Sequence, residues 1–172
     1  MNIKIAITFV VMTLSIVSAG IVSSTVLAQQ SQNAHFIANL SGKSARPPNG
    51  PLSIMATGKA IFTMTNAGKT MLYSVNATKI NHVDNVILVL YTHGHGHSPS
   101  NVVLLRLGSQ HGATGPINGL LVQGNITSSS LVGPLKGKQI SDLVRDMLDG
   151  KVDLWVTTTQ RSHIAGEVTP AT

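Results

Sequence analysis

The chain has 172 residues, no cysteine, and twelve basic against six acidic residues, which give a formal net charge of +6. The lack of cysteine excludes disulfides, thiolate catalysis and thiolate metal sites. Nucleic-acid binding is not expected, because charged residues make up only 10% of the chain and neither a Lys/Arg cluster nor an aromatic platform accompanies the charge.

The N-terminal segment predicts export. Lys4 precedes an uncharged apolar run over residues 5–17, and a small-x-small pattern ends at Ala28, before the polar linker of residues 29–33. This order is typical of a signal peptide over residues 1–28, cleaved after Ala28. The alternative is an uncleaved membrane anchor, because residues 5–28 are long enough to cross a bilayer as a helix. In both cases we expect an extracytoplasmic protein, secreted or at the cell surface, that meets a membrane only through that segment.

Residues 34–170 are expected to form one all-β domain. Val, Ile, Thr, Ser and Gly dominate this part, and short extended segments alternate with turn residues. The predicted strands are His35–Leu40, Ala56–Thr65, Thr70–Thr78, Val86–Tyr91, Asn101–Leu107, Gly119–Thr127, Lys151–Thr158 and Ile164–Val168. We expect a Greek-key-like antiparallel β-sandwich.

Three of these segments carry more detailed expectations. Val86–Tyr91 and Asn101–Leu107 are apolar at consecutive positions, so both are expected in the middle of the domain with both faces covered. Gly119–Thr127 is a weaker strand candidate because Gly124 interrupts it. In the hairpin connection Asn66–Lys69, the Asn and Gly residues are expected to tolerate positive φ.

One short α-helix is expected near residues 140–149. Apolar residues fall on one face of this segment, while three aspartates and an arginine take the other. Gln139 or Ser141 is expected to begin the helix, and Gly150 to end it as a C′ glycine.

The order of short motifs resembles the CHRD (chordin-type) domain family. The motifs are Phe36-x-Ala38-x-Leu40-Ser41-Gly42, Pro47-Pro48, Gly58-x-Ala60-x-Phe62, Leu72-Tyr73-x-Val75, Gly133-Pro134-Leu135-x-Gly137-Lys138, Ser141-Asp142-Leu143-Val144, Gly150, Trp155-Val156 and Gly166-Glu167-Val168. The resemblance covers residues 34–170. It implies an exported prokaryotic, non-catalytic module that binds a protein or surface ligand.

The chain departs from this family at its histidines. Family members usually carry His-x-His on a central strand and another histidine on the late strand before the Gly-Glu motif. Our alignment places Leu90, Thr92 and Thr159 at these positions, so the chain would lack the cluster. A slip of one to three residues would give the first pair to His93 and His95.

His93, His95 and His97 are the sharpest chemical feature of the sequence. Single glycines separate them and permit tight turns that bring alternate imidazoles onto one cation. Neutral imidazole suits Cu(II), Ni(II) or Zn(II), so the segment predicts an exposed metal site that takes copper or zinc, with His82, His111 or His163 as a further ligand. The protein would then be a metal-handling protein or a degenerate metalloenzyme. The alternative is a glycine loop with solvated histidines.

No catalytic residue is predicted. Glu167 is the only glutamate, with no nearby second carboxylate for an acid–base pair, and no Gly-x-Ser-x-Gly elbow is present. We therefore expect no enzyme activity.

Three Asn-x-Ser/Thr sequons, at Asn39, Asn76 and Asn125, lie on or beside predicted strands. In an exported chain they predict glycosylation if the host has the machinery. The alternative is that these asparagines are simply solvated polar positions.

Overall fold

The described part of the chain forms one large antiparallel sheet. The computed structural model describes residues 34–44, 55–91, 99–105, 115–160 and 162–171. The strands are β1 (His35–Ser41), β2 (Thr57–Thr65), β3 (Thr70–Ile80), β4 (Val83–Leu90), β5 (Ser100–Leu105), β6 (Ile117–Ile126), β7 (Val152–Thr158), β8 (His163–Glu167) and β9 (Thr169–Pro170). Their order in the sheet is β5-β4-β7-β8-β1-β2-β3-β6, with β9 paired to β1.

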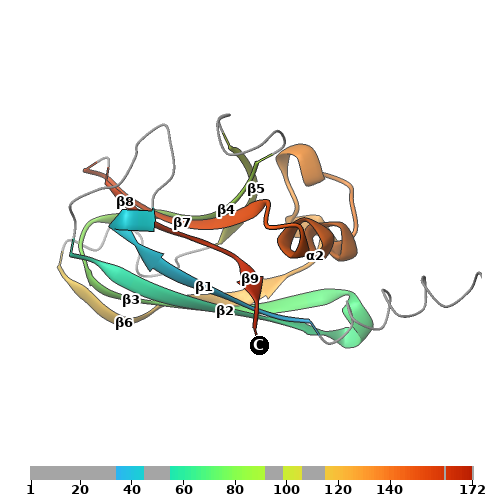
Figure 1. Cartoon of the computed structure of the whole chain (residues 1–172), viewed down its shortest axis with the longest axis horizontal. Coiled ribbons are helices and arrows are strands. Elements are labelled where there is room, and N and C mark those ends of the chain that lie inside the picture. The colour runs from blue at the N-terminus through green and yellow to red at the C-terminus, as the bar shows by residue number, and fades with distance from the viewer. Residues whose placement is uncertain (1–33, 45–54, 92–98, 106–114, 161, 172) are drawn as a thin grey trace, which may run out of the picture.

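The sheet curls so that its two halves face each other as two layers (Figure 1). One layer is β5-β4-β7-β8, and the other is β1-β2-β3-β6. The layers are joined where β8 meets β1, and this junction has a single register pair, Ser41 with Ala165. The predicted antiparallel all-β fold is thus confirmed, as one curled sheet whose two layers share one margin.

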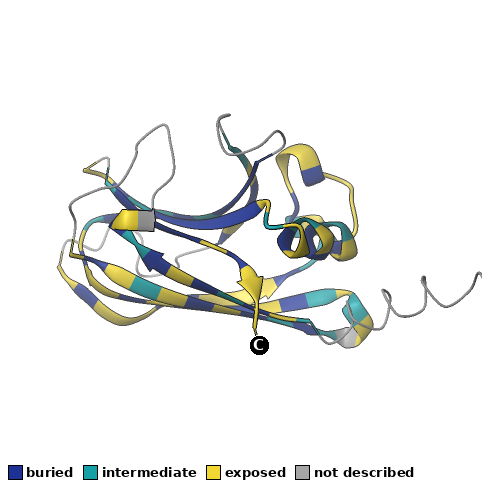
Figure 2. Ribbon diagram, in the orientation of Figure 1, coloured by how far each residue is buried: buried dark blue, intermediate teal, exposed yellow. Residues whose placement is uncertain are grey.

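The core lies between the layers. Buried and exposed residues alternate along β1, β2 and β3, so one face of this layer points inward (Figure 2). Phe36, Phe62 and Tyr73 are register partners across β1, β2 and β3, and all three side chains are buried. Such cross-strand aromatic rows stabilise a sheet by packing as well as by burial.

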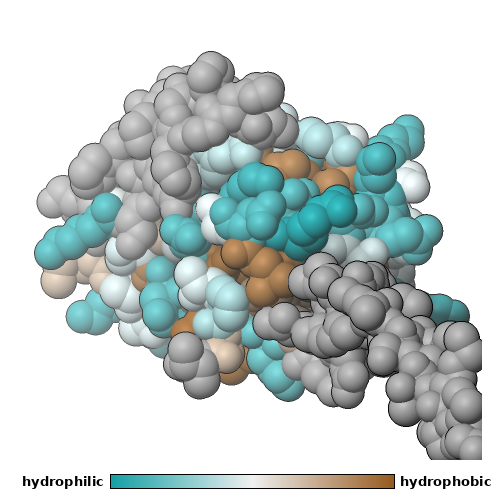
Figure 3. All heavy atoms as spheres, turned by 45° about the vertical axis from the view of Figure 1, so that its right-hand side comes forward, coloured by the Kyte–Doolittle hydropathy of each residue, from teal (hydrophilic) through white to brown (hydrophobic). Residues whose placement is uncertain are grey.

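The predicted helix is confirmed as α2 (Ile140–Leu148). Its N-cap is Gln139, whose backbone N–H donates to the Asp142 carboxylate at 3.0 Å, and Gly150 takes φ of 66° after its end. The apolar side of α2 is buried in the core. Figure 3, in which this end of the molecule comes forward, shows mostly hydrophilic side chains with apolar surface between them. Short 3₁₀ helices span Gly42–Ser44, Asn66–Gly68, Ser128–Ser130 and Gly133–Leu135.

Strand β4 is covered on both faces, as predicted, whereas β5 is not. The inner side chains of β4 join the main core, and Val89 packs with Tyr91, Trp155 and Ala165 on the outer face. The expectation for β5 was wrong, because this strand ends the sheet and Leu104 is 57% exposed.

The misleading apolar run in β5 has a local cause. The β4–β5 register shifts between Leu88, which pairs with Val103, and Val89, which pairs with Asn101. The additional residue, Val102, is buried beside Val103. Consecutive apolar residues therefore mark a β-bulge here rather than a strand covered on both faces.

The β2–β3 connection forms the predicted hairpin, in which two residues have positive φ. The positive φ angles belong to Ala67, at 51°, and Gly68, at 83°. The expectation for glycine is thus confirmed, and Ala67 shares the positive-φ region although it was not expected to.

The predicted leader, residues 1–28, and the linker, residues 29–33, lie outside the described residues. In the described part of the chain, no helix has the length and apolar character to cross a membrane.

Candidate ligand-binding cleft

The two end strands of the sheet bound a cleft. Strands β5 and β6 each pair with one neighbour, and the curl of the sheet brings the layers that they terminate face to face. The β5–β6 cleft between them has a volume of about 610 Å³. It is lined by Tyr73, Val103, Leu104, Leu105, Gln123, Gly124, Asn125, Ile126, Ser129, Ser130 and Val132.

A second hollow adjoins this cleft on the outer face of the β1-β2-β3-β6 layer. This outer depression has a volume of about 600 Å³. Its lining residues are Ile61, Thr63, Leu72, Tyr73, Ser74, Gln123, Gly124 and Asn125. Four of these also line the cleft, so the two hollows meet across β6 and offer one continuous surface.

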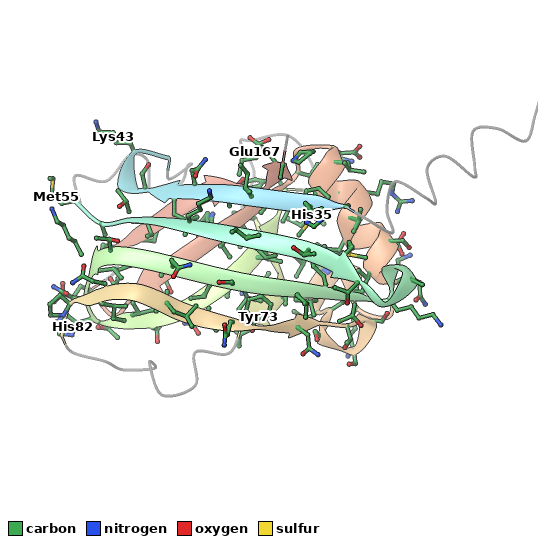
Figure 4. The ribbon with its side chains drawn as sticks, turned by 90° about the horizontal axis from the view of Figure 1, so that it is seen from below. His35, Lys43, Met55, Tyr73, His82 and Glu167 are labelled. Carbon is green, nitrogen blue, oxygen red and sulfur yellow. The ribbon has the colours of Figure 1, made fainter. Side chains whose placement is uncertain are left out.

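The pair Tyr73 and Gly124 forms the boundary between the two hollows. They are register partners on β3 and β6, and Figure 4 shows Tyr73 at the β6 margin of the layer. A Cβ atom on residue 124 would lie 2.8 Å from the Tyr73 Oη and 3.0 Å from its Cζ. Glycine at this position therefore leaves room for the phenol ring beside the β6 backbone.

The described lining of both hollows is uncharged. It combines apolar side chains, among them Leu72 and Leu104, which are 48% and 57% exposed, with amides and hydroxyls. Burying an unpaired charge on such a surface is costly, whereas an uncharged group can hydrogen-bond to the amides. The chemistry favours an uncharged ligand with both apolar and hydrogen-bonding parts.

The metal site predicted from the sequence is not placed by the structure. His93, His95 and His97 lie within residues 92–98, outside the described residues, and so does His111. His82 lies in the turn before β4, whereas Tyr91 directly follows that strand. Among the residues that the structure describes, no group of three His, Asp or Glu side chains is arranged to hold a metal. The metal site stays a prediction.

His163, named above as a possible further ligand, lies in β8 beside Trp155. Its ring stacks on Trp155, with centroids 4.7 Å apart and an interplanar angle of 17°. The side chain is buried, and Nε2 has no hydrogen-bond partner among the described residues. Burial lowers the pKa of His163 below its ordinary value of 6.5, because an imidazolium would lose its hydration there.

This burial predicts acid sensitivity. The folded chain holds His163 neutral where the unfolded chain already protonates it, so the free energy of unfolding is expected to fall as the pH drops below about 6.5. His163→Gln removes the titrating group and is expected to reduce this loss. Urea unfolding at pH 7.5 and pH 5.5 measures this loss of unfolding free energy in the wild type and in the variant. Equal losses in the wild type and the variant would contradict the assignment.

The predicted glycosylation sites all lie on the outer face of the β1-β2-β3-β6 layer. Asn39, Asn76 and Asn125 are exposed on β1, β3 and β6. Asn39 and Asn76 are both register partners of Lys59, while Asn125 lines the cleft and the outer depression. Exposure is compatible with glycosylation, which stays a prediction.

Sequence reasoning did not identify the cleft, although one signal pointed to it. Gly124 was noted as an interruption of a strand, and a glycine inside a strand often marks a close approach by another group. The approaching group is Tyr73, which the sequence places in a different strand.

Of the histidine positions taken from the CHRD resemblance, Leu90 and Thr159 lie near opposite ends of β4, and Thr92 lies outside the described residues. Leu90 is buried in the core and pairs with Val152, whereas Thr159 follows Thr158, which pairs with Val83 at the other end of β4. These ends are about 20 Å apart, given about 3.3 Å per residue. No family model, curated protein or solved structure matches the chain. Membership of the family therefore stays a prediction.

Proposed function

We propose that this chain is an exported, non-catalytic binding module of the CHRD type, and that it holds its ligand in the β5–β6 cleft. The observation that carries the proposal is the continuous uncharged surface formed by the cleft and the outer depression. The N-terminal segment supports a place outside the cytoplasm, secreted or at the cell surface. The motif order supports the domain type.

The size and chemistry of the cleft are those of a binding site. Its volume, about 610 Å³, falls within the range of about 300–1,000 Å³ that ligand sites occupy. Apolar side chains give contact area, and Gln123, Asn125 and Ser130 supply directional hydrogen bonds. Exposed apolar surface beside polar groups is a common mark of an interaction site.

A ligand screen tests this function. The chain, as recovered from the expressing cells, is screened by NMR against uncharged peptides and oligosaccharides. Probes that bind are expected to shift the NMR signals of the backbone amides of Tyr73, Gln123 and Ser130. Leu104→Lys puts a charge at the cleft and is expected to weaken these probes at least tenfold, which corresponds to about 1.4 kcal/mol. Leu148→Lys, on α2, is the matched control and should not weaken them.

Two outcomes would contradict the proposal. In the first, no uncharged probe shifts the signals of the cleft. In the second, the chain binds copper or zinc at micromolar concentration and loses that binding when His93, His95 and His97 are all replaced by alanine, while no probe enters the cleft. The second outcome would support metal handling instead.

A further inference from the structure

We infer that the β5–β6 cleft takes an extended peptide segment of a partner protein, which adds to the sheet along the free edge of β6. The inference rests on the proposed function and names its partner class. Strand β6 ends the strand order and pairs with β3 alone in the described part of the chain. Such an edge presents a row of backbone N–H and C=O groups to an added strand.

The usable part of this edge is Val122–Ile126. Its register with β3 is continuous, from Met71 opposite Ile126 to Val75 opposite Val122. The register then shifts, so Leu121 has no partner, and the bulge bends the remaining part of β6. A straight run of five residues spans about 17 Å, enough to pair with a short peptide.

The edge lacks the side chains that usually prevent strand addition. Lysine, proline and inward-pointing charges protect most edge strands. The β6 sequence, INGLLVQGNI, has no charged residue and no proline. The bulge is confined to one part of β6, so within the described residues neither a bulge, a charge nor a proline of β6 protects the run Val122–Ile126.

On the opposite wall of the cleft, another segment of the chain already hydrogen-bonds to the backbone of β5. Val132 donates its backbone N–H to the carbonyl of Val102 in β5, at 2.8 Å. The segment Ser129–Val132 therefore lies against β5 and closes that side. The peptide has β6 as its hydrogen-bonding edge and β5 as an apolar wall.

The residues that line the cleft favour a peptide in which apolar and polar side chains alternate. Its side chains alternate between the two faces of the sheet. Those on the inner face meet Tyr73, Val103 and Leu105, so they are apolar, and those on the outer face lie beside Gln123 and Asn125, so they are polar. Charged side chains are disfavoured, because the described walls offer them no opposite charge.

A single strand fits this space better than the edge of a second copy. The cleft is bounded on its far side by β5 and by Ser129–Val132. A second copy would present β6 with β3 still attached, and this pair is two strands wide, about 5 Å more than one strand. The occupant is therefore an extended segment free of its own sheet.

Capped hexapeptides of alternating valine and threonine test the inference. One has a normal backbone, and the other is N-methylated at alternate residues, which removes donors needed for strand pairing. NMR titration of the chain is expected to show at least tenfold weaker binding of the methylated peptide. The normal peptide is expected to slow amide exchange at residues 122–126. Gln123→Lys should weaken binding at least fivefold, whereas Gln160→Lys, in an exposed turn, should not.

The outcomes separate this inference from the proposed function. Equal binding of both peptides within the cleft would overturn strand addition and leave the binding module in place. If other uncharged probes bind there and neither peptide does, strand addition is likewise overturned. Self-association of the chain alone that Gln123→Lys abolishes would assign the edge to a second copy. If no uncharged probe enters the cleft, both proposals fail.

Discussion

Phe62→Ala is expected to lower the free energy of unfolding by about 3–5 kcal/mol, the usual cost of removing a buried phenylalanine side chain. Phe62 is completely buried between the layers and lies between Phe36 and Tyr73 in the cross-strand row. The cavity would remove support from both partners. Urea unfolding followed by the fluorescence of Trp155 measures the loss.

The control is the neighbouring residue on the opposite face of the same strand. Ile61 is 45% exposed, so Ile61→Ala removes much less buried surface. Its expected cost is about 1 kcal/mol or less. Similar losses for the two variants would show that the Phe36–Phe62–Tyr73 row is not the packed centre of the domain.

The local elements were predictable because hydrophobic periodicity acts over a few residues. In β3, Tyr73, Val75 and Ala77 are buried and alternate with more exposed neighbours, as the sequence pattern indicates. The apolar stripe of α2 and the C′ glycine Gly150 likewise gave the helix within one residue at its start.

The cleft was not predictable, because it depends on strand order. Which strands end the sheet follows from pairings such as β3 with β6, which join segments far apart in the sequence. The pattern of β5 gave the opposite expectation, since a bulge at Val102 produces the same consecutive apolar residues as a central strand. The sequence shows that Gly124 interrupts an apolar strand pattern. Only the β3–β6 register shows that Tyr73 lies beside it.

The predicted histidine site shows a different limit. Spacing alone suggests that His93, His95 and His97 could share a cation, but spacing does not say what else lies near them. His163 illustrates this point, because its ring is buried against Trp155, a neighbour that the spacing of the histidines does not indicate. Neighbours from other strands decide the chemistry of an imidazole.

Gly166→Ala is expected to destabilise the chain by about 3 kcal/mol, the upper part of the usual range for an overpacked site. Gly166 lies in β8 where this strand approaches β1. An added Cβ would overlap the Asn39 carbonyl oxygen and lie 2.8 Å from its carbon. Backbone atoms cannot rotate away as a side chain can, so β1 and β8 would have to separate.

This separation would also reach the cleft, because the β8–β1 junction joins the two layers that β5 and β6 terminate. Gly166→Ala is therefore expected to weaken cleft-bound probes as well as stability, although residue 166 does not line the cleft. The matched control is Gly115→Ala, since no atom of the described residues lies within 4 Å of the added Cβ there. Its effect on unfolding is expected to stay within about 1 kcal/mol. Urea unfolding and NMR titration of both variants check these effects, and a fully stable Gly166→Ala protein would contradict the close approach of β1 and β8 that closes the fold.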